Sequence, residues 1–182
     1  MIPPPVPADL VPPGYPHPIV LGIDPGTRNL GWGALVLPPS GPRFCACGVL
    51  APPPRLAAVR RLGRLLDELE ELLGCLRPTH VAVEGAFAAR NVRSALRLGE
   101  ARGLVLAAVS RREIPITEIA PASAKKAIVG HGQASKQQVA RMMATLLGID
   151  TGGVPEDATD ALALAWASAQ RLAFAERVGP RR

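Results

Sequence analysis

Short apolar runs alternate with longer amphipathic segments along most of the chain. The first run, residues 19–24, is aliphatic until Asp24 and is followed by a Pro-Gly pair, so it predicts a buried strand that ends in a turn. Residues 31–37 and 44–50 predict two more strands, with the turn-forming segment 38–42 between them. Because strands joined by short turns usually pair side by side, these three predict an antiparallel meander.

Leucine and valine recur at helical spacing from residue 55 to residue 76, which predicts an amphipathic helix lying on the sheet. A fourth strand, 80–84, and a fifth, 116–119, flank another helical segment at 90–109. The last third of the chain predicts three helices: a short one that carries Lys125 and Lys126, one at 135–147 that Ser135 caps, and one at about 156–176.

The amino-terminal residues 1–18 contain eight prolines and no periodic pattern. They predict a disordered or polyproline-like extension outside the fold, so the domain is expected to span 19–176, with a basic tail at 177–182. This length suits one domain with its own core. No apolar run has the length of a membrane helix and the start does not resemble a signal peptide, so we expect a cytoplasmic protein with no membrane partner.

The three cysteines do not have the spacing of a zinc site. Cys45 and Cys47 are expected along one face of a strand, and Cys75 on a helix. Their odd number and the lack of a paired C-x-x-C motif predict reduced thiols.

The net charge of +6 and the pI near 10 weakly favour an anionic partner. The distribution of basic residues says more, because the only lysines lie in one twelve-residue window at Lys125, Lys126 and Lys136, while the other eighteen basic residues are arginine. Either the window needs compact ammonium groups or the clustering is chance. The helix at 90–109 has one acid, Glu100, against four arginines, which sets positive charge beside the end of the fourth strand.

Acidic residues stand at two strand ends and at the start of the last helix. Asp24 and Glu84 each end an apolar strand, where a carboxylate is costly unless a cation or hydrogen-bond donors compensate it. For Asp24 the alternative is simple turn chemistry. Asp157 and Asp160 are three residues apart and share one helix face, although acids also favour helix amino termini in general.

Taken together, the four acids predict a metal site of oxygen ligands. The helix beyond Asp160 is almost entirely apolar, so it should pack on the sheet and hold its two acids near the strand ends. Carboxylate oxygens without a cysteine or histidine cluster suit Mg²⁺ or Mn²⁺ better than zinc. Such a set can hold two ions roughly 3.5–4 Å apart for in-line displacement at phosphorus.

Four segments resemble the RuvC-type Holliday-junction resolvases, in order across about residues 19 to 172. They are Leu21-Gly-Ile-Asp-Pro-Gly-Thr27, Val83-Glu84, the segment from Phe87 to Gly103, and Asp157-Ala-Thr-Asp-Ala-Leu-Ala-Leu-Ala165. The resemblance implies an α/β, ribonuclease-H-like fold, with a five-stranded mixed sheet of three antiparallel and then two parallel strands, flanked by helices. It also implies a structure-selective DNA endonuclease of recombination and repair, which resolves junctions by paired symmetric nicks that leave a 5′-phosphate and a 3′-hydroxyl.

The same resemblance implies cofactors and partners. The cofactor would be Mg²⁺, with Mn²⁺ as a substitute and two ions in each active site. The partners would be four-way junction DNA, a second copy of the chain in a homodimer, and the RuvA/RuvB branch-migration complex.

The resemblance also implies residue roles. The metal-binding and catalytic acids would be Asp24, Glu84, Asp157 and Asp160, and the catalytic lysines near the scissile phosphate would be Lys125 and Lys136. Both lysines would also bind DNA, together with Phe87, Arg90, Arg93 and Lys126. Phe87 matches an aromatic residue that wedges or stacks at the junction, and a core position is its alternative. Some members have His at the position of Asp157, so its role is less strict. His131 is expected as an exposed loop residue.

The residues also allow three alternatives. The segment from Asp24 to Gly31 also resembles the first phosphate loop of actin-like ATPases, but the chain is short for that superfamily and has no second Asp-x-Gly loop. A ribonuclease-H-like enzyme that acts on RNA is disfavoured by the segment from Phe87 to Gly103. A non-catalytic junction-binding protein would be expected to have lost some of the four acids.

Overall fold

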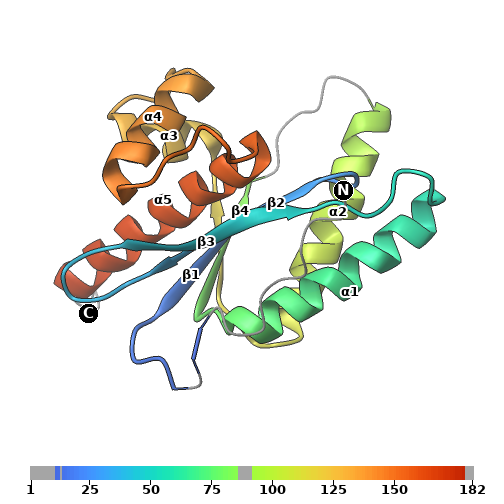
Figure 1. Cartoon of the computed structure of the whole chain (residues 1–182), viewed down its shortest axis with the longest axis horizontal. Helices are drawn as coiled ribbons and strands as arrows, with labels where there is room; N and C mark the ends of the chain where they lie inside the picture. The colour runs from blue at the N-terminus through green and yellow to red at the C-terminus, as the bar shows by residue number, and fades with distance from the viewer. Residues whose placement is uncertain (1–10, 13, 86–91, 179–182) are drawn as a thin grey trace.

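The computed structural model describes residues 11–12, 14–85 and 92–178 (Figure 1). In these residues one sheet contains the strands β1 (Ile19–Asp24), β2 (Leu30–Val36), β3 (Arg43–Leu50), β4 (His80–Glu84) and β5 (Ile116–Ile119). The helices are α1 (Ala58–Leu76), α2 (Val92–Ser110), α3 (Pro121–Val129), α4 (Lys136–Leu147) and α5 (Glu156–Val178). The predicted order of elements is confirmed. α1 begins three residues later than predicted, because residues 53–56 form a turn in which Leu56 N donates to Pro53 O.

The strand order is β3-β2-β1-β4-β5, with β1, β2 and β3 antiparallel and with β4 and β5 parallel to β1. This is the mixed sheet that the family resemblance implied. Ile23 pairs with Val83 across β1 and β4. The next residue of each strand is an acid, so the parallel pairing sets Asp24 and Glu84 at the same edge of the sheet, which we call the acid edge.

Helices cover both faces of the sheet (Figure 1). α1 and α2 pack over one face, where leucines of α1 and valines of α2 meet β1 and β4. α5 lies across the other face, with α3 and α4 packed on its outer side. None of the helices in the described part of the chain is long and apolar enough to cross a membrane.

Glycines in β1 and β2 allow α5 to lie directly on the backbone of the sheet. A Cβ atom on Gly22 would overlap the carbonyl oxygen of Ala161, and one on Gly33 would lie 2.6 Å from Cγ of Leu162. α5 is rich in alanine at this contact, so the side chains on both surfaces are small and the helix lies close to the sheet. The close contact continues to the amino end of α5, at the acid edge.

The expectation that residues 1–18 lie outside the fold is wrong at Val11. Its side chain is only 6% exposed and belongs to the core beneath α1, and its carbonyl oxygen accepts a hydrogen bond of 3.0 Å from Nη2 of Arg77. Arg77 ends α1 in the left-handed conformation, with φ 48°. The pattern of prolines around Val11 hides this apolar position. Residues 1–10, 13 and 179–182 lie outside the described residues.

Cys45 and Cys47 do not share one face of β3. Cys45 packs toward the α1 side of the sheet and Cys47 toward the α5 side. The register of β3 against β2 shifts between Ala34 and Leu35, and this bulge reverses the alternation that i and i+2 positions normally follow. Cys45, Cys47 and Cys75 are free in the structure, as reduced thiols would be. Burial raises the pKa of the Cys45 and Cys47 thiols, which disfavours the reactive thiolate.

Ser168 on α5 is a buried polar residue that is expected to lower the stability of the fold. It is 1% exposed, and its hydroxyl has no hydrogen-bond partner among the described residues. We expect Ser168→Ala to raise the free energy of unfolding by about 1 kcal/mol, because it removes an unpaired buried polar group. Thr159→Val is the control, since the Thr159 hydroxyl donates to Pro155 O at 3.3 Å and its loss should destabilise. Urea unfolding measures both, and a destabilised Ser168→Ala variant would contradict the argument.

Candidate active site

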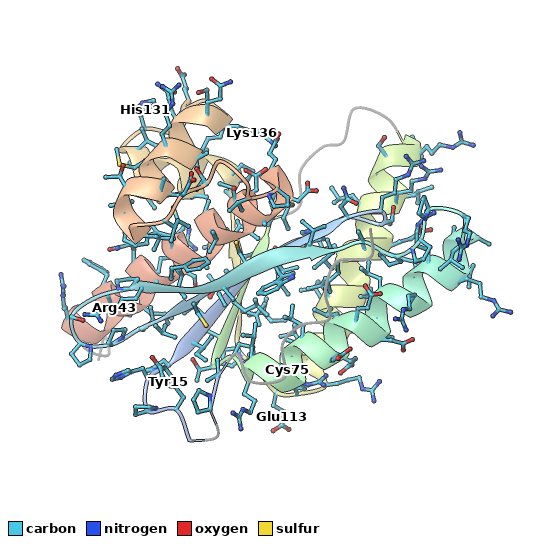
Figure 2. All side chains as sticks on the ribbon, in the orientation of Figure 1. Tyr15, Arg43, Cys75, Glu113, His131 and Lys136 are labelled. Atoms are coloured by element: carbon cyan, nitrogen blue, oxygen red, sulfur yellow. The ribbon has the colours of Figure 1, made fainter. Side chains whose placement is uncertain are left out.

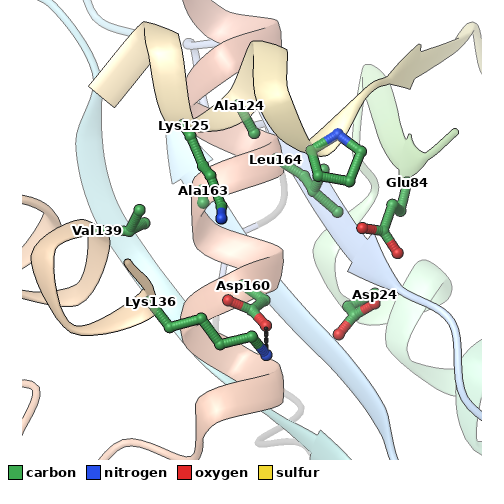
Figure 3. A pocket seen from close by; sticks show the side chains of 10 residues that line it. Asp24, Glu84, Ala124, Lys125, Lys136, Val139, Asp160, Ala163 and Leu164 are labelled. Atoms are coloured by element: carbon green, nitrogen blue, oxygen red, sulfur yellow. Dashed lines mark hydrogen bonds and ion pairs between the residues drawn. The ribbon is translucent and has the colours of Figure 1, made fainter. Parts of the chain in front are cut away.

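A cavity of about 260 Å³ opens at the acid edge (Figure 3). Three carboxylates line it: Asp24 from β1, Glu84 from β4 and Asp160 from α5. Lys125 from α3 and Lys136 from α4 complete its charged lining. The remaining wall is formed by Pro121, Ala124, Val139, Ala163 and Leu164. Five of the side chains that the sequence singled out therefore converge from five separate elements.

The cavity carries more negative charge than its surroundings compensate. The pKa of Asp24 is raised to about 7, first by burial and then by the negative charges of Glu84, Asp160 and Asp157, while Lys136 lowers it. The pKa of Glu84 is also raised, by burial and then by Asp160, with Lys136 opposing. A cation bound in the cavity would therefore stabilise the charged forms of these carboxylates.

Asp157 lies beside the cavity rather than in its lining. It is half-buried in the first turn of α5, and its charge acts on Asp24. A Cβ atom on Gly31 would overlap the Asp157 carbonyl and lie 3.0 Å from the Asp157 Cβ atom. Gly31 is also the residue that pairs with Asp24 across β1 and β2. The start of α5 thus rests on the residue opposite Asp24.

Lys136 is the first residue of α4, and its ammonium group reaches the start of α5. Nζ donates to Oδ2 of Asp160 at 2.8 Å (Figure 3) and to Oε1 of Glu156. These hydrogen bonds raise the pKa of Lys136. The predicted cap of α4 is confirmed as a capping box, in which Ser135 Oγ accepts from Gln138 N and Gln138 Oε1 accepts from Ser135 N. Because Lys136 directly follows the capping residue, the capping box fixes the backbone position of Lys136 at the start of α4.

The other basic residues differ in their position. Lys126 is exposed and does not line the cavity. Arg93 is exposed in the first turn of α2. His131 is exposed between α3 and α4, as expected (Figure 2). Phe87 and Arg90 lie outside the described residues, so their predicted DNA contacts stay predictions.

Arg102 has a role that the sequence did not indicate. In the sequence it is one of four arginines on a basic helix, whereas in the structure its side chain is only 17% exposed. Nη2 forms an ion pair of 2.6 Å with Oε2 of Glu118 on β5, and Nε donates to the Glu84 carbonyl oxygen at 3.4 Å. Arg102 therefore ties α2 to the ends of β4 and β5 and fixes the backbone that carries Glu84.

The donor set suits a hard divalent cation in its chemistry. It consists of carboxylates, and the raised pKa of Asp24 shows that Lys136 alone does not offset their charge. Among the described residues, no group of three or more His, Cys, Asp or Glu side chains is arranged to hold a metal ion as it stands. Binding would therefore need the side chains to close together, and the metal-binding role of the four acids stays a prediction.

Comparisons with known proteins give one family. The family model described as "Crossover junction endodeoxyribonuclease RuvC" matches residues 20–168. A protein of that name from Chlorobaculum parvum is 42% identical over 153 residues, which cover 84% of this chain and 82% of the relative. Another, from Anaeromyxobacter dehalogenans, is 43% identical over 157 residues, which cover 86% and 83%.

Solved structures agree with this family. The structure titled "T. thermophilus RuvC in complex with Holliday junction substrate" matches with a TM-score of 0.79 and 35% identity, covering 87% of this chain and 96% of that one. The yeast mitochondrial Holliday junction resolvase Ydc2 matches with a TM-score of 0.60 at 15% identity, covering 92% and 89%, which shows a shared fold only. The predicted ribonuclease-H-like fold is confirmed.

Proposed function

Because the chain belongs to the RuvC family of crossover junction endodeoxyribonucleases, and is therefore a nuclease that resolves Holliday junctions, we propose that the cavity at the acid edge is where it cleaves DNA. One observation carries the proposal: three carboxylates and two ammonium groups from five elements line a single cavity. Of these five groups, Asp24 is the most buried and its pKa is the most strongly shifted, which is typical of a group in an active site.

The four acids would hold the metal. Asp24, Glu84 and Asp160 line the cavity, and Asp157 lies one helical turn from Asp160. The charges of the other three acids all act on Asp24, so a cation bound beside Asp24 would interact with all four. We infer two ions in each site, Mg²⁺ with Mn²⁺ as a substitute. When bound, such ions supply an activated water and stabilise the leaving oxygen at phosphorus.

The lysines would act on the phosphate itself. Lys125 on α3 and Lys136 on α4 line the same cavity as Asp24 and Glu84. Their ammonium groups can therefore neutralise charge on the non-bridging oxygens of a bound phosphate. Lys136 starts from its contacts with Asp160 and Glu156, so its approach to a phosphate exchanges carboxylate partners for phosphate oxygens. Phe87, Arg90, Arg93 and Lys126 would contact the junction around the cavity. The products would be a 5′-phosphate and a 3′-hydroxyl.

We infer that the protein acts as a homodimer through the amino-terminal half of α2. This half-helix is almost entirely exposed and carries two large apolar side chains, Val92 at 77% and Leu96 at 65% exposure. Two such faces packed together would place two cavities on two DNA strands, as paired symmetric nicks require.

We expect Leu96→Glu to convert the dimer to a monomer and to replace paired nicks by single ones, because it puts a charge into an apolar contact. Sedimentation analysis measures the mass, and a supercoiled plasmid with an extruded cruciform separates paired from single nicks. Phe174→Glu is the control, since Phe174 is 68% exposed on α5 and lies outside the proposed contact. A Leu96→Glu variant that stays dimeric would exclude this interface.

The location and the further partner belong to the same proposal. Three free thiols support a reducing compartment such as the cytoplasm. The RuvA/RuvB complex is proposed as a partner on the family resemblance, and co-purification on junction DNA would test it.

The direct test of the function is a cleavage assay on a synthetic four-way junction, with linear duplex and an RNA–DNA hybrid as controls. We expect symmetric nicks in the junction only, and only with Mg²⁺ or Mn²⁺. Cleavage of the linear controls at the same rate, or of the junction in the presence of a chelator, would overturn the proposal.

A further inference from the structure

The charges of α1 run against the helix dipole. Its amino-terminal half carries Arg60, Arg61 and Arg64, with no acid in the first turn, and its carboxyl-terminal half carries Asp67, Glu68, Glu70 and Glu71. A positive charge at a helix amino end is unfavourable by about 0.3–1 kcal/mol. A helix face that only needed solvation would gain from the reverse order. The arrangement therefore suggests that these arginines serve an anionic partner.

The amino end of α1 lies at the acid edge. Nε of Arg61 donates to the Thr27 carbonyl oxygen at 2.9 Å, and Thr27 is three residues after Asp24. Nη1 of the same guanidinium donates to the Leu56 carbonyl oxygen at 3.4 Å, just before the helix. In Figure 1 the amino ends of α1, α2 and α5 all lie on the side where β1 ends. Arg61 thus fastens the start of α1 to the loop that follows a carboxylate of the cavity.

Around this fastening the arginines are exposed. Arg28 in the loop after β1, Arg55 before α1 and Arg60 within it have no acidic partner among the described residues. Arg64 pairs with Glu68 at 3.1 Å, but its side chain is 59% exposed. We call Arg28, Arg55, Arg60 and Arg64 the α1 basic surface.

We propose that the α1 basic surface binds the phosphate backbone of a duplex arm of the junction, away from the cleaved phosphate. The inference rests on the proposed function, because it takes the acid edge as the place where DNA lies. Arginine forks match phosphate oxygens in geometry, and such contacts position DNA without reading its sequence. Because this surface borders the edge that holds the cavity, a duplex that leaves the cavity toward α1 meets it.

The test compares two double variants that lose the same charge. Arg55→Gln/Arg60→Gln removes two residues of the α1 basic surface, and Arg111→Gln/Arg177→Gln removes two exposed arginines from the carboxyl ends of α2 and α5, at the opposite edge. Junction binding is measured by fluorescence anisotropy over a range of salt, with Asp24→Asn added to prevent cleavage. We expect the first pair to weaken binding roughly tenfold and to reduce the salt slope by about 2, as the loss of two phosphate contacts predicts. The second pair should change neither.

Two further measurements separate this surface from other causes. Junctions whose arm phosphates outside the cleavage site are replaced by uncharged methylphosphonates should show no difference between the two double variants, because the arginines then meet no phosphate charge. With Asp24 restored, Arg111→Gln/Arg177→Gln should nick as the parent protein does, whereas Arg55→Gln/Arg60→Gln should need roughly tenfold more protein for half-maximal nicking. Its melting temperature should not fall, because the removed charges oppose the helix dipole.

Equal affinity and equal salt slope in both double variants would overturn the inference, as would a difference that persists on the uncharged arms. If the parent protein nicks junctions but the variants do not differ, this inference fails alone. If the parent does not nick junctions, the proposed function fails first.

Discussion

Asp24→Asn should bind a four-way junction as tightly as the parent protein and should not nick it. The substitution keeps the size of the side chain but replaces a carboxylate that lines the cavity with a neutral amide. We expect a loss of at least about 10³-fold in the nicking rate, the scale on which removal of a principal charged group acts. Single-turnover cleavage with Mg²⁺, beside junction binding without metal, measures the two effects. Undiminished cleavage would show that another residue does this work.

The same substitution should stabilise the protein at neutral and alkaline pH. The pKa of Asp24 is about 7 in the fold against 3.8 as its ordinary value, so between these values the folded protein binds a proton that the unfolded chain does not. The stability of the parent therefore falls as the pH rises from about 4 to about 7, and the loss is complete above 7. Asparagine carries no charge and avoids it. We expect Asp24→Asn to be more stable by roughly 1–3 kcal/mol at pH 8, with the difference fading toward pH 4.

Denaturant unfolding at pH 5 and pH 8 without added metal measures this effect. Asp67→Asn is the control, because Asp67 is exposed on α1 and far along the helix from the acid edge. It should show no such pH-dependent gain. A gain for Asp24→Asn that is equal at both pH values would mean that burial and the neighbouring carboxylates do not penalise the charge of Asp24. An Asp24→Asn variant that is less stable at pH 8 would instead show a structural role.

The elements and the acids could be predicted because their signals are local. Each strand is a short apolar run between turn residues, and an acid that ends such a run stands out at once, as Asp24 and Glu84 do. Asp157 and Asp160 share a helix face by spacing alone. The position of Asp24 beside Glu84 follows once the two strands are parallel neighbours.

The sequence could not reveal features that depend on distant contacts. Arg102 looks like a surface base until Glu118 and the Glu84 carbonyl are placed next to it. The bulge that separates Cys45 from Cys47 depends on how β3 aligns with β2, and the apolar run of β3 looks the same with or without it. Glu156 stands next to Asp157, but its contact with Lys136 joins residues twenty positions apart.

Gly31 is the clearest case of a residue whose role the sequence hides. In the sequence it is one glycine in a strand, whereas in the structure it is paired with Asp24 and lies against the backbone of Asp157. Only a hydrogen atom fits between β2 and the first turn of α5, since a Cβ there would overlap the Asp157 carbonyl. We infer that Gly31 sets the distance of the two α5 acids from Asp24.

Gly31→Ala should therefore impair nicking more than it impairs folding. The added methyl group must push the start of α5 off the sheet, and we expect this overpacking to cost roughly 1–3 kcal/mol of stability. Displacing catalytic groups by about 1 Å can cost 10²-fold in rate, so we expect nicking at saturating junction to fall by about 10²-fold or more. The concentration of Mg²⁺ needed for half-maximal rate should rise as well. Junction binding without metal should change little.

Gly33→Ala is the matched control, because it overpacks the same helix against the same strand. Its Cβ atom would lie 2.6 Å from Leu162 Cγ and 2.8 Å from Leu162 N, beyond the turn that holds Asp157 and Asp160. It should lose similar stability but keep more of the nicking rate and an unchanged Mg²⁺ requirement. Both rates are compared at a temperature where each variant is fully folded. Equal losses of nicking rate in the two variants would mean that the rate follows the general stability of the helix–sheet contact. The position of the two acids would then not decide the rate, because only the methyl group of Gly31→Ala presses on the backbone of Asp157.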